Sequence, residues 1–150
     1  NSVSVVMENI MSLPESSMEN YVSYALAAAH RVVSTSLASR LKKHGVQVEA
    51  WRIMEALALD PELTMGDLAK VVLIIPSTLS KLVDRMVSDG LVHRQFASSD
   101  HRQVNLHLTD LGRKRMVQIR SEVEDEDEIW TSRLGPERAS QLVELLRDLV

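Results

Sequence analysis

The sequence predicts a mainly α-helical fold with a small β-hairpin. Only 5 glycines, 4 prolines and 3% aromatic residues occur among 150 residues, a composition that favours helix over sheet. Apolar residues recur at steps of three and four along most of the chain, which is the helical period, whereas residues 103–108 alternate in polarity like a half-buried strand. A hydrophobic fraction of 45% supplies enough apolar surface for a single domain over residues 1–150.

The first dozen residues have no clear period, and we expect a loosely ordered arm there. From Met18 the spacing predicts one long helix that stops at Gly45, because glycine suits a left-handed C-cap. Its apolar stripe is wide enough to need a partner. The stripe comprises Met18, Val22, Ala25, Leu26, Ala29, Val33, Leu37 and Leu41.

Two shorter helices are predicted next. One begins near Val48 and runs until Asp60-Pro61 interrupts the pattern. In the other, Thr64 and Asp67 fit a capping box, which satisfies exposed backbone amides at the start of a helix. That helix should run to about Val71.

Pro76 opens a further helix, predicted from Pro76 to Ser88 and closed by Gly90, because proline has no amide proton to lose at the first helical position. Two short helices joined by a few residues indicate a helix-turn-helix. The second of them has two contrasting faces. Its apolar face is Leu79, Leu82, Val83 and Met86, and its polar face is Ser77, Thr78, Ser80, Lys81 and Arg85.

After Gly90 the period changes from helical to alternating. The segment Leu91–Phe96 and the apolar positions Val104, Leu106 and Leu108 predict two paired strands, with the polar residues 97–102 at the hairpin tip. A hairpin directly after a helix-turn-helix is a wing. The predicted fold class is therefore a winged helix-turn-helix.

Two helices are predicted after the wing. Thr109 caps a long one, from about Leu111 to Thr131, and Gly135-Pro136 begins a last one whose leucines cannot stay exposed. We therefore expect a winged helix at about residues 46–110. The helices at about residues 14–45 and 111–150, which flank it, have apolar faces that need partners.

The net charge of −4 is unevenly distributed along the chain. Between Thr64 and Arg115 eight basic residues stand against five acidic ones, which gives +3, and the remainder carries −7. Much of the acid lies in the run from Glu122 to Glu128, which is typical of a solvated helix face. A basic centre favours nucleic acid as the partner of that region.

The polar face of the helix from Pro76 to Ser88 has the chemistry to read DNA. Small hydroxylated residues let a helix approach base edges, and Lys81 or Arg85 can reach guanine or phosphate. An ordinary amphipathic surface helix is the alternative. At the hairpin tip the Asp100 carboxylate could hold Arg102 extended for a narrow minor groove, and a simple polar turn is the alternative.

These motifs closely resemble the multiple antibiotic resistance regulator (MarR) family, in element order over nearly the whole chain. The resemblance rests on residues 79–92, on Asp100-His-Arg102 and on Leu106-His-Leu-Thr-Asp-Leu-Gly112. It implies a homodimer held by the first helix and the last two, with recognition helices in successive major grooves of a palindromic operator in double-stranded DNA.

The resemblance also implies roles for individual residues. Arg102 enters the minor groove while Asp100 orients it, within a wing set that includes Ser98 and His101. The turn Leu73-Ile-Ile75 and Pro76 depart from the family by leaving few polar groups at the start of the recognition helix. Base contacts are implied for Ser77, Thr78, Ser80 and Lys81, and backbone contacts for Arg85 and Arg94.

Many members of that family release DNA when a small aromatic acid or phenol binds between the dimerisation helices and the winged domain. We therefore expect a ligand-released repressor. A guanidinium or imidazole beside apolar walls suits a planar anion, and ordinary packing of the same residues is the alternative. The expected lining is Tyr24, His30, Arg31, Trp51, Arg52, Met54, Met116 and Arg120.

Nothing in the sequence favours an enzyme. It has no cysteine, no glycine-rich phosphate loop and no nucleophile elbow. Its 5 histidines lack metal-ligand spacing except for His93 and His107, which can face each other across the hairpin, as ordinary surface residues also do. We expect no cofactor and no metal, and a cytoplasmic protein, because no apolar run is long enough to span a membrane. Two rival functions stay open: a winged-helix module for protein contact or dimer scaffolding without specific DNA binding, and a ligand-responsive activator.

Overall fold

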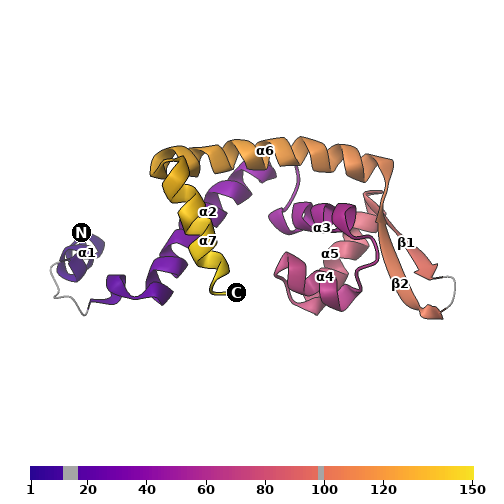
Figure 1. The fold of residues 1–150 in the computed structure, drawn as a ribbon, viewed down its shortest axis with the longest axis horizontal. Helices are drawn as coiled ribbons and strands as arrows, with labels where there is room; N and C mark the ends of the chain where they lie inside the picture. Colours follow the sequence, from indigo (N-terminus) through magenta and orange to yellow (C-terminus); the bar gives the residue numbers. More distant parts are fainter. Residues whose placement is uncertain (12–16, 98–99) are drawn as a thin grey trace. The chain divides into compact units, whose positions relative to one another are not determined.

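The computed structural model describes residues 1–11, 17–97 and 100–150, and for residues 9–11, 97 and 100–104 it describes the backbone alone. Helices dominate, and the two strands form one antiparallel hairpin (Figure 1), as the sequence predicts. The chain divides into two compact units, Asn1–Leu37 and Ala38–Val150.

The first unit contains helix α1 (Ser2–Met11), the short 3₁₀ helix η1 (Met18–Asn20) and most of α2 (Val22–Lys42). The expectation of a loosely ordered arm is wrong for Ser2–Met11, because Asn1 caps that helix through a hydrogen bond from the Val3 amide to Asn1 Oδ1 (3.1 Å). Among the described side chains of α1, those of Val3, Val5, Val6 and Met7 are exposed in the single chain. The long helix predicted from Met18 is confirmed from Val22 onward.

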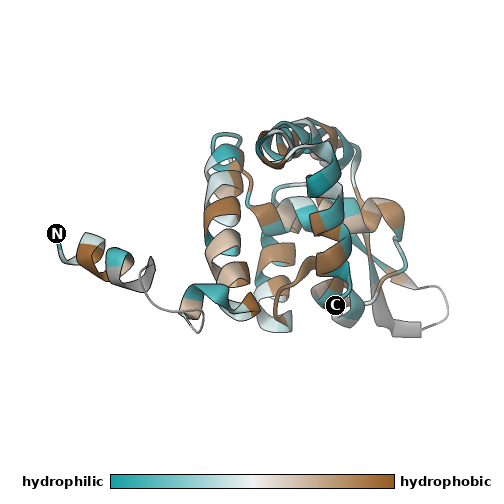
Figure 2. Ribbon diagram, turned by 60° about the vertical axis from the view of Figure 1, so that its left-hand side comes forward, coloured by the Kyte–Doolittle hydropathy of each residue, from teal (hydrophilic) through white to brown (hydrophobic). Residues whose placement is uncertain are grey.

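The second unit begins with the end of α2 and continues through α3 (Val48–Leu59), α4 (Met65–Val72) and α5 (Pro76–Ser88). Thr64 caps α4 as predicted, since its hydroxyl accepts a hydrogen bond from the Asp67 amide at 3.1 Å. Apolar and polar residues take turns along these helices (Figure 2), as amphipathic helices require.

The core of the second unit lies where α3, α4, α5 and the hairpin meet. Each fully buried Leu, Ile or Met stabilises the fold by about 1.5–3 kcal/mol, so this cluster fixes how the helix-turn-helix sits on its neighbours. Its fully buried large side chains include Ile53, Met54, Leu68, Val72, Leu79, Val83 and Leu106.

The hairpin pairs β1 (Val92–Ala97) with β2 (Asp100–Leu108), in a register that sets Val92 opposite Leu108 and Phe96 opposite Val104. Leu106 and Leu108 are buried, as their alternation predicts. The predicted tip is too wide, because the backbone of Asp100 to Arg102 already belongs to β2 and the register shifts only after Phe96. Hydrogen bonding across the hairpin continues further toward its end than polarity alone suggests.

Helix α6 (Asp110–Leu134) follows the wing at once, and a glycine sets how closely they approach. A Cβ atom at Gly112 would lie 2.1 Å from the Leu91 carbonyl oxygen, well inside van der Waals contact. Thr109 completes the junction: its amide donates to that oxygen at 3.1 Å, and its hydroxyl donates to the Gly90 carbonyl and accepts from the Gly112 amide. The segment Leu108-Thr-Asp-Leu-Gly112 thus joins the wing to α6.

The chain ends in α7 (Pro136–Arg147), which begins at Gly135 and Pro136 as predicted, while α6 extends three residues beyond its predicted end at Thr131. Gly135 has a φ of 89°, so the break between the two helices uses a conformation that glycine adopts easily. The apolar face of α7 is exposed in the single chain. It includes Leu142, Val143 and Leu145, and Leu149, which follows the end of the helix, is exposed as well.

Candidate DNA-binding face

Helix α5 has one face packed on the core and one face exposed to solvent. Leu79, Leu82, Val83 and Met86 are all buried, as their spacing predicts, and they anchor the helix on the core. The polar residues of the opposite face are exposed to solvent. They are Ser77, Thr78, Ser80, Lys81 and Arg85, the residues for which base or backbone contacts are expected.

The turn before α5 is apolar and exposed. Leu73 ends α4 in the left-handed region, at φ 64° and ψ 39°, which costs a residue with a Cβ about 1–2 kcal/mol. Ile75 occupies the N-cap of α5, where it offers no side-chain cap bond, and Pro76 follows in the first turn. Leu73 is 74% exposed and Ile75 is 65% exposed, so burial of the side chain offsets neither the backbone strain at Leu73 nor the missing cap bond at Ile75.

The wing is tied to α5 by an ion pair between Arg94 on β1 and Asp84 on α5. Arg94 is one of the two residues predicted to contact the DNA backbone, with Arg85, and it has donors beyond those that one carboxylate oxygen accepts. On the same strand the ring of His93 stacks on that of His107 across the hairpin, with centroids 5.4 Å apart and planes at 21°. The wing therefore has a defined position beside α5.

The wing residues predicted to enter the minor groove are not placed. Ser98 lies outside the described residues, and for Asp100, His101 and Arg102 only the backbone is described, as the first residues of β2. Their roles stay predictions.

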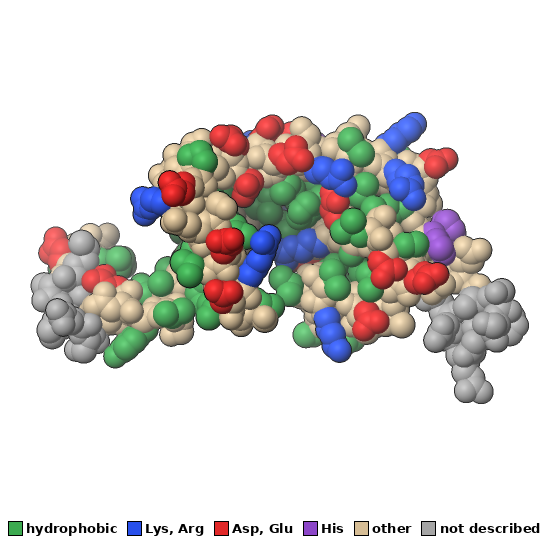
Figure 3. All heavy atoms as spheres, viewed as in Figure 1, with side chains coloured by type: hydrophobic (Ala, Val, Ile, Leu, Met, Phe, Trp, Pro, Cys, Tyr) green, Lys and Arg blue, Asp and Glu red, His purple; other side chains and the backbone are tan. Residues whose placement is uncertain are grey.

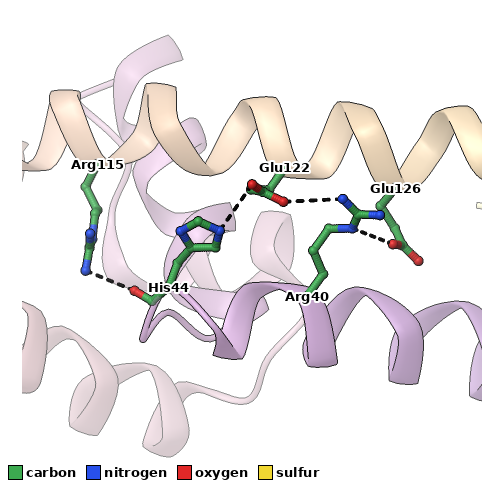
Figure 4. A network of polar contacts seen from close by, with 5 residues as sticks. All are labelled: Arg40, His44, Arg115, Glu122 and Glu126. Carbon is green, nitrogen blue, oxygen red and sulfur yellow. Dashed lines mark hydrogen bonds and ion pairs between the residues drawn. The ribbon is translucent and has the colours of Figure 1, made fainter.

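The end of α2 is fastened to α6 by a polar network (Figure 4). Arg40 donates from Nε to Glu126 Oε2 at 2.7 Å and from Nη1 to Glu122 Oε2 at 3.3 Å, and the Glu126 and Glu122 hydrogen bonds raise the pKa of the guanidinium. His44 Nε2 lies 3.2 Å from Glu122 Oε1, and Arg115 donates to the His44 carbonyl oxygen at 3.0 Å. These contacts hold the last turn of α2 and the segment after it against α6.

This network corrects the interpretation of the acidic run. Figure 3 shows acidic side chains along much of α6, as a solvated face would have. Glu126, however, is buried and Glu122 is half-buried, and both bind Arg40. The four-residue step between the two glutamates places them on one helix face, which is the signal in the sequence for a shared partner.

A second polar cluster joins α3 to α6 and involves two residues of the expected ligand site. Arg120 donates from Nε and Nη2 to the two oxygens of Glu55, at 2.8 and 2.7 Å, and Trp51 Nε1 donates to Glu55 Oε1 at 3.1 Å. The Arg120 hydrogen bonds hold the pKa of the Glu55 carboxyl below its usual range, against partial burial, which raises it. Sequence reasoning missed Glu55. The signal for it is its position four residues after Trp51, which places the two side chains on one face of α3.

The other residues of the expected ligand site divide between core and surface. Met54 and Met116 are buried, in keeping with the packing alternative, and Arg52 is half-buried. Tyr24, His30 and Arg31 belong to α2 within the first unit, where Tyr24 is half-buried and the other two are exposed. The ligand assignment stays a prediction.

A hollow of about 310 Å³ lies where α6 meets α7, and none of the predicted ligand residues lines it. Its wall includes Trp130, whose indole N–H is buried and has no hydrogen-bond partner within the described parts of the chain. Arg133 lies over the Trp130 ring, with its guanidinium carbon 4.9 Å from the centroid. The remaining wall is mostly apolar and includes Leu134, Pro136, Ala139, Leu142 and Val143.

Neither a membrane span nor a metal cluster occurs within residues 1–11, 17–97 and 100–150. No helix there is long and apolar enough to cross a membrane. Nor do three or more His, Asp or Glu residues gather in these ranges in a way that would hold a metal ion.

Comparison with known proteins gives consistent matches. A model of the MarR family matches residues 44–103, which contain α3, α4, α5 and most of the wing. The HTH-type transcriptional regulator FarR of Neisseria gonorrhoeae is 30% identical over 137 residues, covering 91% of this chain and 94% of FarR. The homoprotocatechuate degradative operon repressor of Escherichia coli is 26% identical over 133 residues, covering 89% of this chain and 90% of that protein.

Among solved structures, that of NadR in complex with 4-hydroxyphenylacetate superposes with a TM-score of 0.74 at 30% identity. The match covers 91% of this chain and 97% of the NadR chain. The likeness thus extends over almost the full length of both proteins.

Proposed function

This chain belongs to the MarR family of transcriptional regulators, and from that membership we propose that it is a homodimeric repressor. It binds a palindromic operator and leaves it when a small aromatic acid or phenol binds. The observation that carries the proposal is the solvent-exposed face of α5, which presents three hydroxyls and two cations, while its opposite, apolar face is packed on the core. A helix with this division can enter a major groove without losing its packing.

The charge distribution supports DNA as the partner. The segment from Thr64 to Arg115 carries +3 in a chain of net −4, and it includes α4, α5 and the wing. The Arg94–Asp84 pair keeps the wing beside α5, so that both elements can meet one duplex. The basic segment favours DNA over a protein-contact role without DNA binding.

Exposed apolar surface supports the homodimer. The leucines of α7, the mostly apolar wall of the hollow beside Trp130 and the valines of α2 are open to solvent in the single chain, and exposed apolar patches mark sites of protein association. A second copy of the chain is the partner that we propose for these faces. Two recognition helices would then address half-sites roughly 34–36 Å apart, one turn of the duplex.

The Glu55–Arg120 pair supports release by an aromatic acid. The solved relative NadR binds 4-hydroxyphenylacetate, which combines an aromatic ring with a carboxylate. In this chain Arg120 already holds a carboxylate, that of Glu55, with the Trp51 indole beside it. A ligand carboxylate would compete with Glu55 for Arg120 and so alter the link between α3 and α6.

A gel-shift titration tests the DNA-binding part of the proposal. The duplexes are the promoter region of the protein's own gene and a shuffled sequence of equal length, each titrated at several salt concentrations. We expect tight, salt-dependent binding to the promoter duplex alone, and Arg102→Ala should weaken it while the dimer survives. Equal and weak binding to both duplexes would favour the protein-contact module instead.

Two further measurements test the assembly and the ligand. Light scattering should give twice the chain mass. Phenols and aromatic carboxylates, with 4-hydroxyphenylacetate among them, should raise the melting temperature and release the promoter duplex. Transcription from that promoter in cells then separates a repressor from an activator.

A further inference from the structure

The start of the recognition helix carries an exposed isoleucine where a polar residue is usual. Ser, Thr, Asp or Asn at an N-cap accepts a hydrogen bond from a free amide of the first turn. Ile75 cannot, and its side chain is exposed. The position therefore gains neither the cap bond nor the burial.

Ile75 adjoins the residues expected to meet base edges. Pro76 follows it, then the exposed Ser77 and Thr78, all within the first turn of α5. The N-terminal residues of a recognition helix are the ones that contact bases in the major groove. An exposed side chain at this end thus belongs to the proposed DNA-binding face.

The major groove offers one apolar group to such a side chain. Guanine, cytosine and adenine present only hydrogen-bond donors and acceptors there, whereas thymine adds its C5-methyl group. An isoleucine side chain packed against a donor or acceptor of a base would remove that polar group from water without replacing its hydrogen bond. Packed against the thymine methyl group, the side chain buries apolar surface of both the protein and the base.

We propose that Ile75 is a specificity-determining residue that selects thymine, by packing on its C5-methyl group, at the base pair facing the start of α5 in each half-site. This inference rests on the proposed DNA-binding function. Exposed cations flank the turn along the chain, Lys70 on α4 and Lys81 on α5. That charge favours a duplex over an apolar protein surface as the occupant.

The test uses duplexes that the full-length wild-type protein selects from a random library. Each selected duplex is then made with deoxyuridine in place of thymidine in the half-sites, first at every thymine and then one at a time. Deoxyuridine keeps the pairing and lacks only the methyl group. Wild-type protein and Ile75→Ala are titrated against both forms.

Wild-type protein should bind the deoxyuridine duplex about fourfold more weakly for each methyl group removed from beneath Ile75, since one buried methylene is worth about 0.8 kcal/mol and 1.4 kcal/mol is tenfold. Two symmetric half-sites raise the loss to about 15-fold. The loss should trace to one thymine in each half-site. Ile75→Ala should bind both duplexes alike, whereas Ile75→Val should keep most of the discrimination.

Leu59→Ala is the matched control. It removes an even more exposed apolar side chain, 87% exposed, from the end of α3, and it should discriminate like the wild type.

Four outcomes would overturn the inference. If wild-type protein binds the thymidine and deoxyuridine duplexes equally, no methyl group is read. If Ile75→Ala still prefers the thymidine duplex to the deoxyuridine duplex by the full wild-type factor, another residue contacts the methyl group. If Ile75→Ala changes only the oligomeric mass, a second copy of the chain covers this side chain. If the library yields no enriched sequence, the proposed function fails as well.

Discussion

Gly112→Ala should destabilise the protein although alanine is the better helix former. Gly112 lies in the first turn of α6, where alanine would ordinarily gain about 1 kcal/mol over glycine. Here the new Cβ atom would lie 2.1 Å from the Leu91 carbonyl oxygen and 3.1 Å from its carbon. Both atoms are backbone, so no side-chain rotation relieves the clash.

The magnitude follows from these distances. Overpacking in a dense interior costs about 1–3 kcal/mol when side chains can adjust, and this obstacle is backbone. We therefore expect a net loss of about 3 kcal/mol, which for a chain of this length lowers Tm by about 6–12 °C. The Leu91 oxygen also accepts from the Thr109 amide, so relief by separation would break the junction between wing and α6.

Thermal and urea unfolding followed by circular dichroism measure this effect, at one protein concentration for all variants. Gly66→Ala is the matched control: Gly66 also lies in a helix, but its nearest neighbour would be 3.9 Å away, and the change should stabilise by about 0.5–1 kcal/mol. Gly45→Ala separates strain from clash, because Gly45 has open space and a φ of 69°. A Gly112→Ala protein as stable as Gly66→Ala would refute the close approach of wing and α6.

Four other changes probe the DNA face, the acid response and the assembly. Lys81→Ala and Arg85→Ala should each lower the slope of log affinity against log salt by about 0.9 for every phosphate that the removed cation neutralises, and an unchanged slope for both would remove α5 from the interface. Arg120 lowers the pKa of the Glu55 carboxyl, so this pair stabilises the fold above the ordinary carboxyl pKa of 4.5 and ceases to do so as pH falls through the lower folded value. Glu55→Gln should abolish that part of the acid response in urea melts. If the variant and the wild type have the same profile of stability against pH, the pair is not its source. Deleting residues 135–150 should give monomeric or insoluble protein, and a soluble dimer on sizing would contradict the role of α7.

The local elements of this fold could be predicted because each is decided by neighbours in the chain. Helix α5 starts at Pro76 and ends at Ser88 as its proline, period and glycine indicate, and the capping hydroxyl of Thr64 acts within three residues. The faces of α5 follow from the same period. Sequence reasoning missed the helix Ser2–Met11, although Val3, Val6, Met7 and Ile10 recur at the helical steps of three and four.

The tertiary structure alone decided which side chains meet across the fold. Arg40 and Glu126 are 86 residues apart, and Arg120 and Glu55 are 65 apart. Such pairs depend on how far one helix slides along another, which packing sets and a single period does not encode. Burial likewise could be assigned to Met54 and Met116 only from the tertiary structure, and their role in ligand binding stays a prediction.

The sequence by itself determined the order of elements, the helix caps, the two faces of α5 and the family resemblance, because backbone hydrogen bonding and amphipathic periods are local. Only the tertiary structure revealed that Glu55 is paired with Arg120, that two glutamates of the acidic run bind the arginine at the end of α2, and that the wing packs against α6 at Gly112. Those contacts join elements distant in sequence, so their partners become known only once the core has set the position of each helix.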